Sequence, residues 1–305
     1  MEFHFITQHA RELTHGNLAK WASYSSNTRA TQKSVWEIMN STAETRHVLT
    51  VPCDSHDLQL IFKDLLWPDK DNHGNSTSAM GEFFKSGPNA VVSFFSSSDK
   101  QLALLRSVMQ LCYSKIRALI KTTPTRWGKQ IAQIDFICNS ENALKGYIAH
   151  PDATISTIKS LLSTPQFWQK LSGLQLFFKP VHTYQKTSES NGTTLNKVYP
   201  RWIDINRHIN EFQLEESCSP LWQKINSYCT STQGGWNQRM EKQLLPIHLA
   251  AYILIPENSK TVILPHFQEQ IHDFIRAKCG KNSSAVASNF EYIDQEGPFN
   301  ILASC

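Results

Sequence analysis

The sequence predicts a mainly α-helical protein in which a small, incomplete α/β core at the N-terminal end is joined to a large helical domain. A short β-branched run at residues 48–52 is followed at once by apolar residues at helical spacing. Beyond a polar loop at 67–75, helical spacing continues almost to the C-terminus. Hydrophobic residues make up 40% and charged residues 18% of the chain, which is typical of a globular protein.

The N-terminal part contains one predicted strand between two predicted helices. Residues 31–39 predict a helix with Val35, Trp36 and Met39 on one side, and residues 48–52 predict a strand that ends at a proline. Residues 58–66 predict the second helix. A strand, a turn and a helix within about twenty residues form an α/β unit.

The helical part is predicted from a series of apolar stripes. One stripe ends before Pro124, and residues 183–194, rich in Ser, Thr, Asn and Gly, predict a flexible linker. The predicted helices cover residues 102–119, 127–147, 155–162, 167–178, 201–228, 244–255 and 266–278.

Net charge, cysteine content and apolar runs restrict the expected cellular compartment more than the expected binding partner. A formal net charge of +4 is compatible with nucleic-acid binding but does not establish it. The seven cysteines are odd in number and contain no CxxC pair, which favours reduced intracellular thiols. The N-terminus lacks a signal-peptide pattern, and the longest apolar run, 249–256, is too short to cross a bilayer. We therefore expect a soluble nuclear or cytoplasmic protein, neither secreted nor membrane-bound.

The most specific segment is Cys53-Asp54-Ser55-His56, which opens the predicted helix. Cys53 and His56 are three residues apart, so they project to the same side of that helix. A zinc site would need four ligands and a nucleophilic dyad would need a third, orienting group. The interpretation we favour is a local buried pair that fixes the turn between strand and helix, because free cysteine is often buried.

Two further segments stand out. Residues 125–128 read Thr-Arg-Trp-Gly, and Arg126, Trp127 and Lys129 are candidate DNA contacts, the cations for phosphates. The alternative for Trp127 is a core position. The two cations belong to a cluster of cations in the sequence: Arg106, Arg117, Lys121, Arg126 and Lys129. Residues 246–256 form an apolar helix ended by proline, in which His248 is expected to be a hydrogen-bonded buried histidine.

In order and spacing these three segments resemble signatures of hAT-family DNA transposases of the fungal type. Residues 90–95 and 100–106 are also similar to the family, whereas Asp57 stands where the family has glycine. The resemblance covers most of the chain. It implies a partial RNase H-like α/β core at 1–75, a helical insertion domain at 76–280, and the start of a returning RNase H-like segment at 281–305. It also implies that both ends of the family's chain are cut off, including its C-terminal dimerisation segment.

The resemblance implies a site of three carboxylates, two Asp and one Glu, which hold two Mg²⁺ ions in intact members. The first Asp has no counterpart, because too little sequence precedes Cys53. Ser26 stands where the second Asp belongs and is followed by the expected Asn27. Glu291 and Glu296 are alternatives for the catalytic Glu. We therefore expect no bound metal or cofactor in this chain, and no transposition catalysed by it.

Two functions of different classes remain open. The first is a DDE-type transposase remnant that binds DNA without sequence specificity through the cation cluster. The alternative is a non-catalytic helical module that binds protein partners through aromatic side chains. We expect these aromatics to form the core instead: Trp168, Phe177, Phe178, Trp202 and Trp222.

Overall fold

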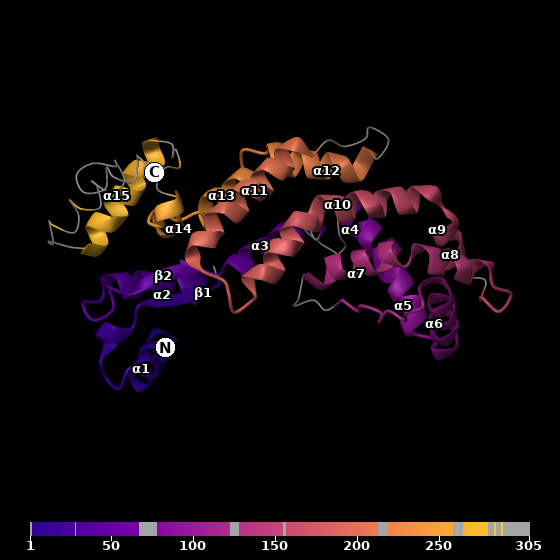
Figure 1. Cartoon of the computed structure of the whole chain (residues 1–305), viewed down its shortest axis with the longest axis horizontal. Coiled ribbons are helices and arrows are strands. Elements are labelled where there is room, and N and C mark those ends of the chain that lie inside the picture. Colours follow the sequence, from indigo (N-terminus) through magenta and orange to yellow (C-terminus); the bar gives the residue numbers. More distant parts are fainter. Residues whose placement is uncertain are drawn as a thin grey trace. The chain divides into compact units, whose positions relative to one another are not determined.

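The computed structural model describes residues 2–27, 29–66, 78–122, 128–154, 157–212, 219–258, 261, 265–279, 284 and 288. Within them the chain is mainly helical, as the sequence predicts, and it contains one two-stranded parallel sheet (Figure 1). The predicted site residues Arg126, Trp127, Glu291 and Glu296 lie outside the described residues.

The chain forms two compact units. Unit 1 comprises Met1–Asp57, Ser188–Asp204 and Arg239–Cys305, and unit 2 comprises Leu58–Thr187 and Ile205–Gln238. The sequence suggested boundaries near residues 75 and 280 instead. The division at 187/188 lies within the Ser- and Thr-rich segment 183–194, at the end of a helix, whereas the other divisions fall inside helices and are not marked by a change of composition.

The sheet of unit 1 consists of β1 (Ser23–Ser26) and β2 (Leu49–Pro52), connected by α2 (Ala30–Ser41). The strands are parallel, with Ser23 opposite Leu49 and Ser26 opposite Pro52. Parallel neighbours need such a crossover, which α2 supplies. The predicted helix 31–39 and strand 48–52 are confirmed. The helix α3 (Asp54–Leu66) begins two residues after β2, as the sequence predicts.

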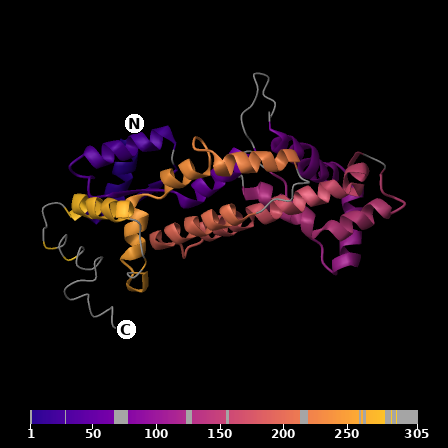
Figure 2. The same ribbon diagram turned by 90° about the horizontal axis from the view of Figure 1, so that it is seen from above.

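A small apolar core lies between the first helix, α1 (Glu2–Leu13), and this α/β unit. Its buried members are Val35, Met39 and Val48, against which Phe3 and Ile6 of α1 pack. Figures 1 and 2 show α1 alongside the strands and α2. Trp36, predicted to share a face with Val35 and Met39, is only half-buried and is not part of this cluster.

A second cluster in unit 1 joins α14 (Pro246–Ile253) and α15 (Pro265–Cys279). Leu249, Ala250, Ile253 and Ile271 form its buried centre, and the two helices lie side by side (Figure 2). Tyr199 packs against the cluster from the start of α11 (Val198–Glu211), which follows the short helix η3 (Leu195–Lys197).

The described residues of unit 2 form helices and the segments that connect them, with no strand among them. Ser78 and Ser98 cap two of its helices by accepting bonds from backbone amides of the first turn. Besides parts of α3 and α11, its elements are α4 (Ala79–Phe84), the π-turn η2 (Lys85–Asn89), α5 (Ala90–Ser96), α6 (Asp99–Tyr113), α7 (Gly128–Asn139), α8 (Glu141–Ala149), α9 (Thr157–Ser163), α10 (Pro165–Ser188), α12 (Ser219–Thr230) and α13 (Trp236–Gln243). The helix α13 continues into unit 1.

Aromatic rings dominate the core of unit 2. The rings of Phe62 and Phe178 meet edge-on at 5.3 Å between centroids, and those of Phe95 and Tyr147 at 4.9 Å. The aromatic residues considered above as a partner surface are all buried, Trp202 in unit 1 and the others in unit 2. The core interpretation of these side chains is confirmed.

Several predicted stripes are longer than the helices that form. The helix α6 ends at Tyr113 because Ser114 adopts a left-handed conformation, so the predicted continuation to residue 119 is wrong. The stripe 127–147 is divided between α7 and α8, which meet at Ser140. The predicted helix 201–228 is divided between α11 and α12.

The predicted linker at 183–194 is wrong over its first half, since α10 continues to Ser188. Burial of His182 and Gln185 anchors this part of the helix despite its polar composition. The hydroxyls of Thr183 and Thr187 donate to carbonyls one turn earlier, so these residues are satisfied within the helix. No described helix is both long enough and apolar enough to span a bilayer.

Candidate functional site

The carboxyl ends of the two parallel strands bring together the residues that the sequence singled out. Ser26 ends β1 and is followed by Asn27, while Cys53 follows β2. The Cys53 amide donates to the Ser26 carbonyl at 2.8 Å and extends the ladder beyond the strands. Both signatures therefore lie at one sheet edge, the usual position for ligand sites in open α/β sheets.

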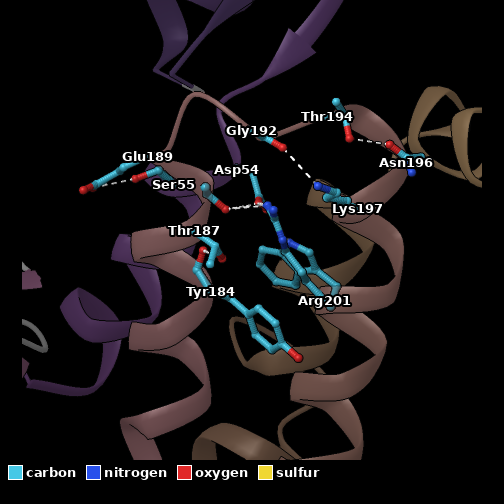
Figure 3. Close-up of polar contacts among 12 residues, drawn as sticks. Asp54, Ser55, Tyr184, Thr187, Glu189, Gly192, Thr194, Asn196, Lys197 and Arg201 are labelled. Carbon is cyan, nitrogen blue, oxygen red and sulfur yellow. Dashed lines mark hydrogen bonds and ion pairs between the residues drawn. The ribbon is translucent and has the colours of Figure 1, made fainter.

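Beside this edge, Asp54 is the centre of a buried polar cluster (Figure 3). Arg201 Nη1 donates to Asp54 Oδ2 at 2.9 Å and to Ser188 Oγ at 2.8 Å. Ser188 Oγ in turn donates to the same carboxylate oxygen. Trp202 Nε1 donates to the other oxygen, Oδ1, at 2.8 Å. Both carboxylate oxygens of Asp54 are thus occupied by donors.

Desolvation explains why this cluster needs so many contacts. Asp54 and Arg201 are each more than nine-tenths buried, and a buried charge is tolerated only when it is paired and hydrogen-bonded. The indole of Trp202 supplies the fourth contact from a wholly buried ring. The cluster therefore joins the start of α3 to α11 within unit 1.

A second set of contacts organises the loop before η3. Ser55 Oγ donates to Glu189 Oε1 at 2.9 Å, and Lys197 Nζ donates to the Gly192 carbonyl at 3.1 Å. Figure 3 shows these bonds on either side of the Asp54 cluster. Together they hold residues 188–197 against the first turn of α3.

Cys53 is a half-buried free thiol. Burial raises the pKa of the Cys53 thiol above its ordinary value, an effect opposed by the backbone amide of His56 and added to by the charges of Asp57 and Asp54. A thiol of raised pKa stays protonated near neutral pH and is a poor nucleophile. The sulfur faces the backbone of the first turn of α3, where His56 is half-buried. This geometry favours the turn-fixing interpretation over the nucleophilic dyad.

His248 lies wholly buried in α14. Its Nδ1 accepts a bond from the Leu245 amide at 3.2 Å, whereas no described residue is hydrogen-bonded to Nε2. Burial lowers the pKa of His248 to about 4, although the charge of Asp54 and the Gln243 carbonyl oppose the shift. The expected buried histidine is found, but only one of its ring nitrogens is hydrogen-bonded.

A cavity of about 570 Å³ lies between the sheet edge and α14. Hydroxyl groups of Ser25, Ser55 and Thr194 line it together with the apolar side chains of Val51 and Ile255. Cys53, Asp54 and His248 also border it. Its size suits a small ligand, and its chemistry, with a paired carboxylate, a protonated thiol and a neutral imidazole, is suited to binding.

The donors at this edge do not fit a two-magnesium centre. Ser26 offers a neutral hydroxyl, which donates to the Asn27 carbonyl at 3.3 Å, and the Asp54 carboxylate is taken up by Arg201. In the described part of the chain, no three His, Cys, Asp or Glu side chains are grouped so that they could hold a metal ion. Hard oxygen ligands with negative charge are what Mg²⁺ requires.

The remaining predicted residues lie in unit 2. Lys129 is half-buried in the first turn of α7, and Arg106 and Lys121 are exposed. Arg117 lies over the ring of Tyr113 at 4.5 Å and donates to the Asn139 carbonyl. Sequence reasoning missed Ser188, Glu189 and Arg201 as site residues, because their partners are more than 130 positions away.

No family model, no curated protein and no solved structure matches this chain.

Proposed function

We propose that this protein is a non-catalytic remnant of a hAT-type DNA transposase, with an RNase H-like core and a helical insertion, that binds DNA without sequence specificity. The observation that carries the DNA-binding part is a concentration of positive charge at residues 99–130. Seven cations stand there against one carboxylate, Asp99, a net charge of +6, whereas the whole chain carries +4. The cations are Lys100, Arg106, Lys115, Arg117, Lys121, Arg126 and Lys129.

The exposure and pairing of these cations support a phosphate-binding role. Lys100, Arg106, Lys115 and Lys121 are exposed, and none has an ion-pair partner among the described residues. Elsewhere in unit 2 the exposed Lys85 and Lys145 pair with carboxylates one turn away. Cations left without internal partners are free to replace the counterions of a DNA backbone.

The loss of catalysis is inferred from the sheet edge. With Ser26 at the position of the second Asp and Asp54 bound to Arg201, the edge lacks the charge that two Mg²⁺ ions need. We expect purified protein to catalyse no Mg²⁺-dependent hairpin formation or strand transfer on transposon ends. Robust cleavage that disappears in Glu291→Ala would overturn this part of the proposal. A DNA-binding role further implies a nuclear location.

DNA binding is tested by fluorescence anisotropy on a labelled duplex of arbitrary sequence, titrated between about 50 and 200 mM salt. We expect affinity to fall steeply with salt, and Arg106→Gln/Lys121→Gln to reduce the slope of log K against log salt by about 1 to 2. The matched control is Lys63→Gln/Lys179→Gln, which removes two exposed cations of unit 2 outside the segment. Absence of binding at low salt, or an equal loss in the control, would contradict the proposal.

The alternative, a protein-interaction module, depended on exposed aromatic side chains, and the aromatic residues named for it are buried. Trp168, Phe177, Phe178, Trp202 and Trp222 are all at most 7% exposed. Aromatics packed in a core are not available as anchors for a partner.

A further inference from the structure

A second cavity in unit 1, of about 360 Å³, lies between α2 and the C-terminal end of α13. Lys33, Trp36 and Glu37 of α2 line one side, and Arg239, Lys242 and Gln243 line the other. The strand β2 contributes Thr50 and Pro52. None of these residues belongs to the cation segment 99–130, and those of α2 and α13 lie outside the Cys53–His56, 125–128 and 246–256 signatures.

Gln243 is the unusual member of this cavity. Gln243 is only 1% exposed, and among the residues that the structure describes neither Oε1 nor Nε2 of its side chain has a hydrogen-bond partner. A buried amide left unpaired on both atoms has lost its water without compensation, which proteins rarely tolerate. A ligand that supplies one acceptor and one donor side by side would satisfy both atoms at once.

Trp36 adds a flat aromatic surface to the same cavity. Trp36 is half-buried, and its indole Nε1 also lacks a hydrogen-bond partner within the described part of the chain. An indole face next to a primary amide matches a planar heteroaromatic ring that stacks and hydrogen-bonds along one edge. A peptide group could meet the amide, but it offers no ring for Trp36.

The charges around the opening indicate a phosphate. Lys33 and Lys242 are exposed and have no ion-pair partner among the residues that the structure describes. Arg239 is a third cation of the lining. Against these stand two carboxylates, Glu37 and Asp57, which could accept bonds from sugar hydroxyls.

We infer that this cavity binds an adenine nucleotide, with the base between Trp36 and the Gln243 amide and the phosphate on Lys33 and Lys242. We place the N6–H and N7 edge of adenine on the Gln243 amide, because this edge presents an adjacent donor and acceptor, whereas the corresponding edge of guanine presents two acceptors and suits arginine. The Gln243 amide is buried from water, so its side chain must rotate toward the cavity before the base can form hydrogen bonds with it. The ligand is either a free nucleotide or an unpaired adenine in a DNA strand.

The inference is independent of the duplex binding proposed for residues 99–130. The experiment is isothermal titration calorimetry of the full chain with AMP, adenosine, GMP and CMP, and with nine-nucleotide strands of dA and dT. We expect AMP to bind at least tenfold more tightly than GMP and more tightly than CMP. Binding of the dA strand but not of AMP would assign the site to single-stranded DNA, and binding of AMP alone would assign it to the free nucleotide.

Gln243→Leu should reduce AMP affinity at least tenfold without lowering the melting temperature, because it removes an amide that has no partner. Gln268→Leu, a half-buried glutamine of α15 that does not line the cavity, is the matched control. Lys242→Gln should weaken AMP but not adenosine, since only the phosphate is affected.

Arg106→Gln/Lys121→Gln should leave AMP binding unchanged, so failure of the duplex proposal and failure of this one are distinguishable. The inference is overturned if neither AMP nor the dA strand binds, if GMP or CMP binds as tightly as AMP, or if Gln243→Leu and Gln268→Leu behave alike.

Discussion

Arg201 donates to the carboxylate of Asp54, 147 positions earlier in the chain, at 2.9 Å, and both side chains are more than nine-tenths buried. The Ser188 hydroxyl accepts from Arg201 and donates to Asp54, which closes a triangle of bonds (Figure 3). This pair holds three separate segments of unit 1 together at the edge of the sheet. The Cys53–His56 motif therefore contributes a structural carboxylate, that of Asp54, to the site.

The Asp54–Arg201 pair predicts a large asymmetry between single and double variants. Arg201→Met leaves the Asp54 charge buried and unpaired, so we expect it to lower the free energy of unfolding by about 3–5 kcal/mol. Replacing both, as Asp54→Leu/Arg201→Met, should restore most of that loss. Arg11→Met, which breaks an exposed ion pair with Glu44, should cost less than about 1 kcal/mol. Urea denaturation measures all three variants, and equal effects of the two arginine substitutions would refute the prediction.

His248 predicts a specific loss of stability in mild acid. Its folded pKa of about 4 lies below the ordinary value of 6.5, because burial disfavours the charged ring. Between pH 6.5 and 4 the His248 side chain is therefore protonated in the unfolded chain but neutral in the folded chain. The contribution of His248 to the free energy of unfolding is complete above pH 6.5. It is lost as the pH falls toward 4, by about 3 kcal/mol in all.

His248→Gln, which cannot titrate, should flatten this part of the stability curve. The curve is measured by urea denaturation at half-unit steps of pH from 7 to 4. His150→Gln removes a histidine that is not buried and should leave the curve as it is. An unchanged acid slope in His248→Gln would show that other groups cause it.

The sequence predicted many of the elements with apolar periodicity, although not α1, and it missed β1 and the end of α10. The strand β1 reads Ser-Tyr-Ser-Ser, with no β-branched residue, and is held by its pairing with β2. The extension of α10 to Ser188 was missed because its polar composition is that of a loop, whereas burial of His182 and Gln185 keeps it helical. Tertiary packing decides both cases.

The candidate site was predictable only where it is local in sequence. The proximity of Ser26 and Cys53 follows from two short segments of one α/β unit, and the sequence indicated both. The partners of Asp54 come from α10 and α11, at distances along the chain that no spacing rule covers. A buried arginine also looks like any surface arginine in the sequence, because charged residues are almost always exposed.

The four described cysteines that are free predict a selective labelling pattern. Burial raises the pKa of Cys138 to about 12 and that of Cys229 to about 11, and it raises the pKa of Cys53 as well. Cys112 is the exposed member of the set. At pH 8 we expect iodoacetamide to modify Cys112 well before the other three, because only the thiolate reacts and it must be accessible. Peptide mapping by mass spectrometry measures the order, and early modification of Cys53 would contradict the turn-fixing interpretation.

Gly173 and Gly192 predict opposite responses to the same substitution. A Cβ added at Gly173, within α10, would lie under 3.0 Å from the ring of Trp222, whereas one added at Gly192 would meet no described atom within 4 Å. Alanine favours the helix over glycine by about 1 kcal/mol, but forcing a methyl group into a packed contact costs about 1–3 kcal/mol. The clash should outweigh the propensity, because the ring of Trp222 is itself buried and has little room to move.

We therefore expect Gly173→Ala to lower the melting temperature and Gly192→Ala to leave it unchanged or raise it slightly. Adding Trp222→Leu to Gly173→Ala should produce less than the sum of the two single effects, because the smaller side chain removes the clash. Differential scanning calorimetry of the four variants measures the coupling. Strict additivity would mean that Gly173 and Trp222 are not in contact and that α10 and α12 pack differently from the arrangement seen here.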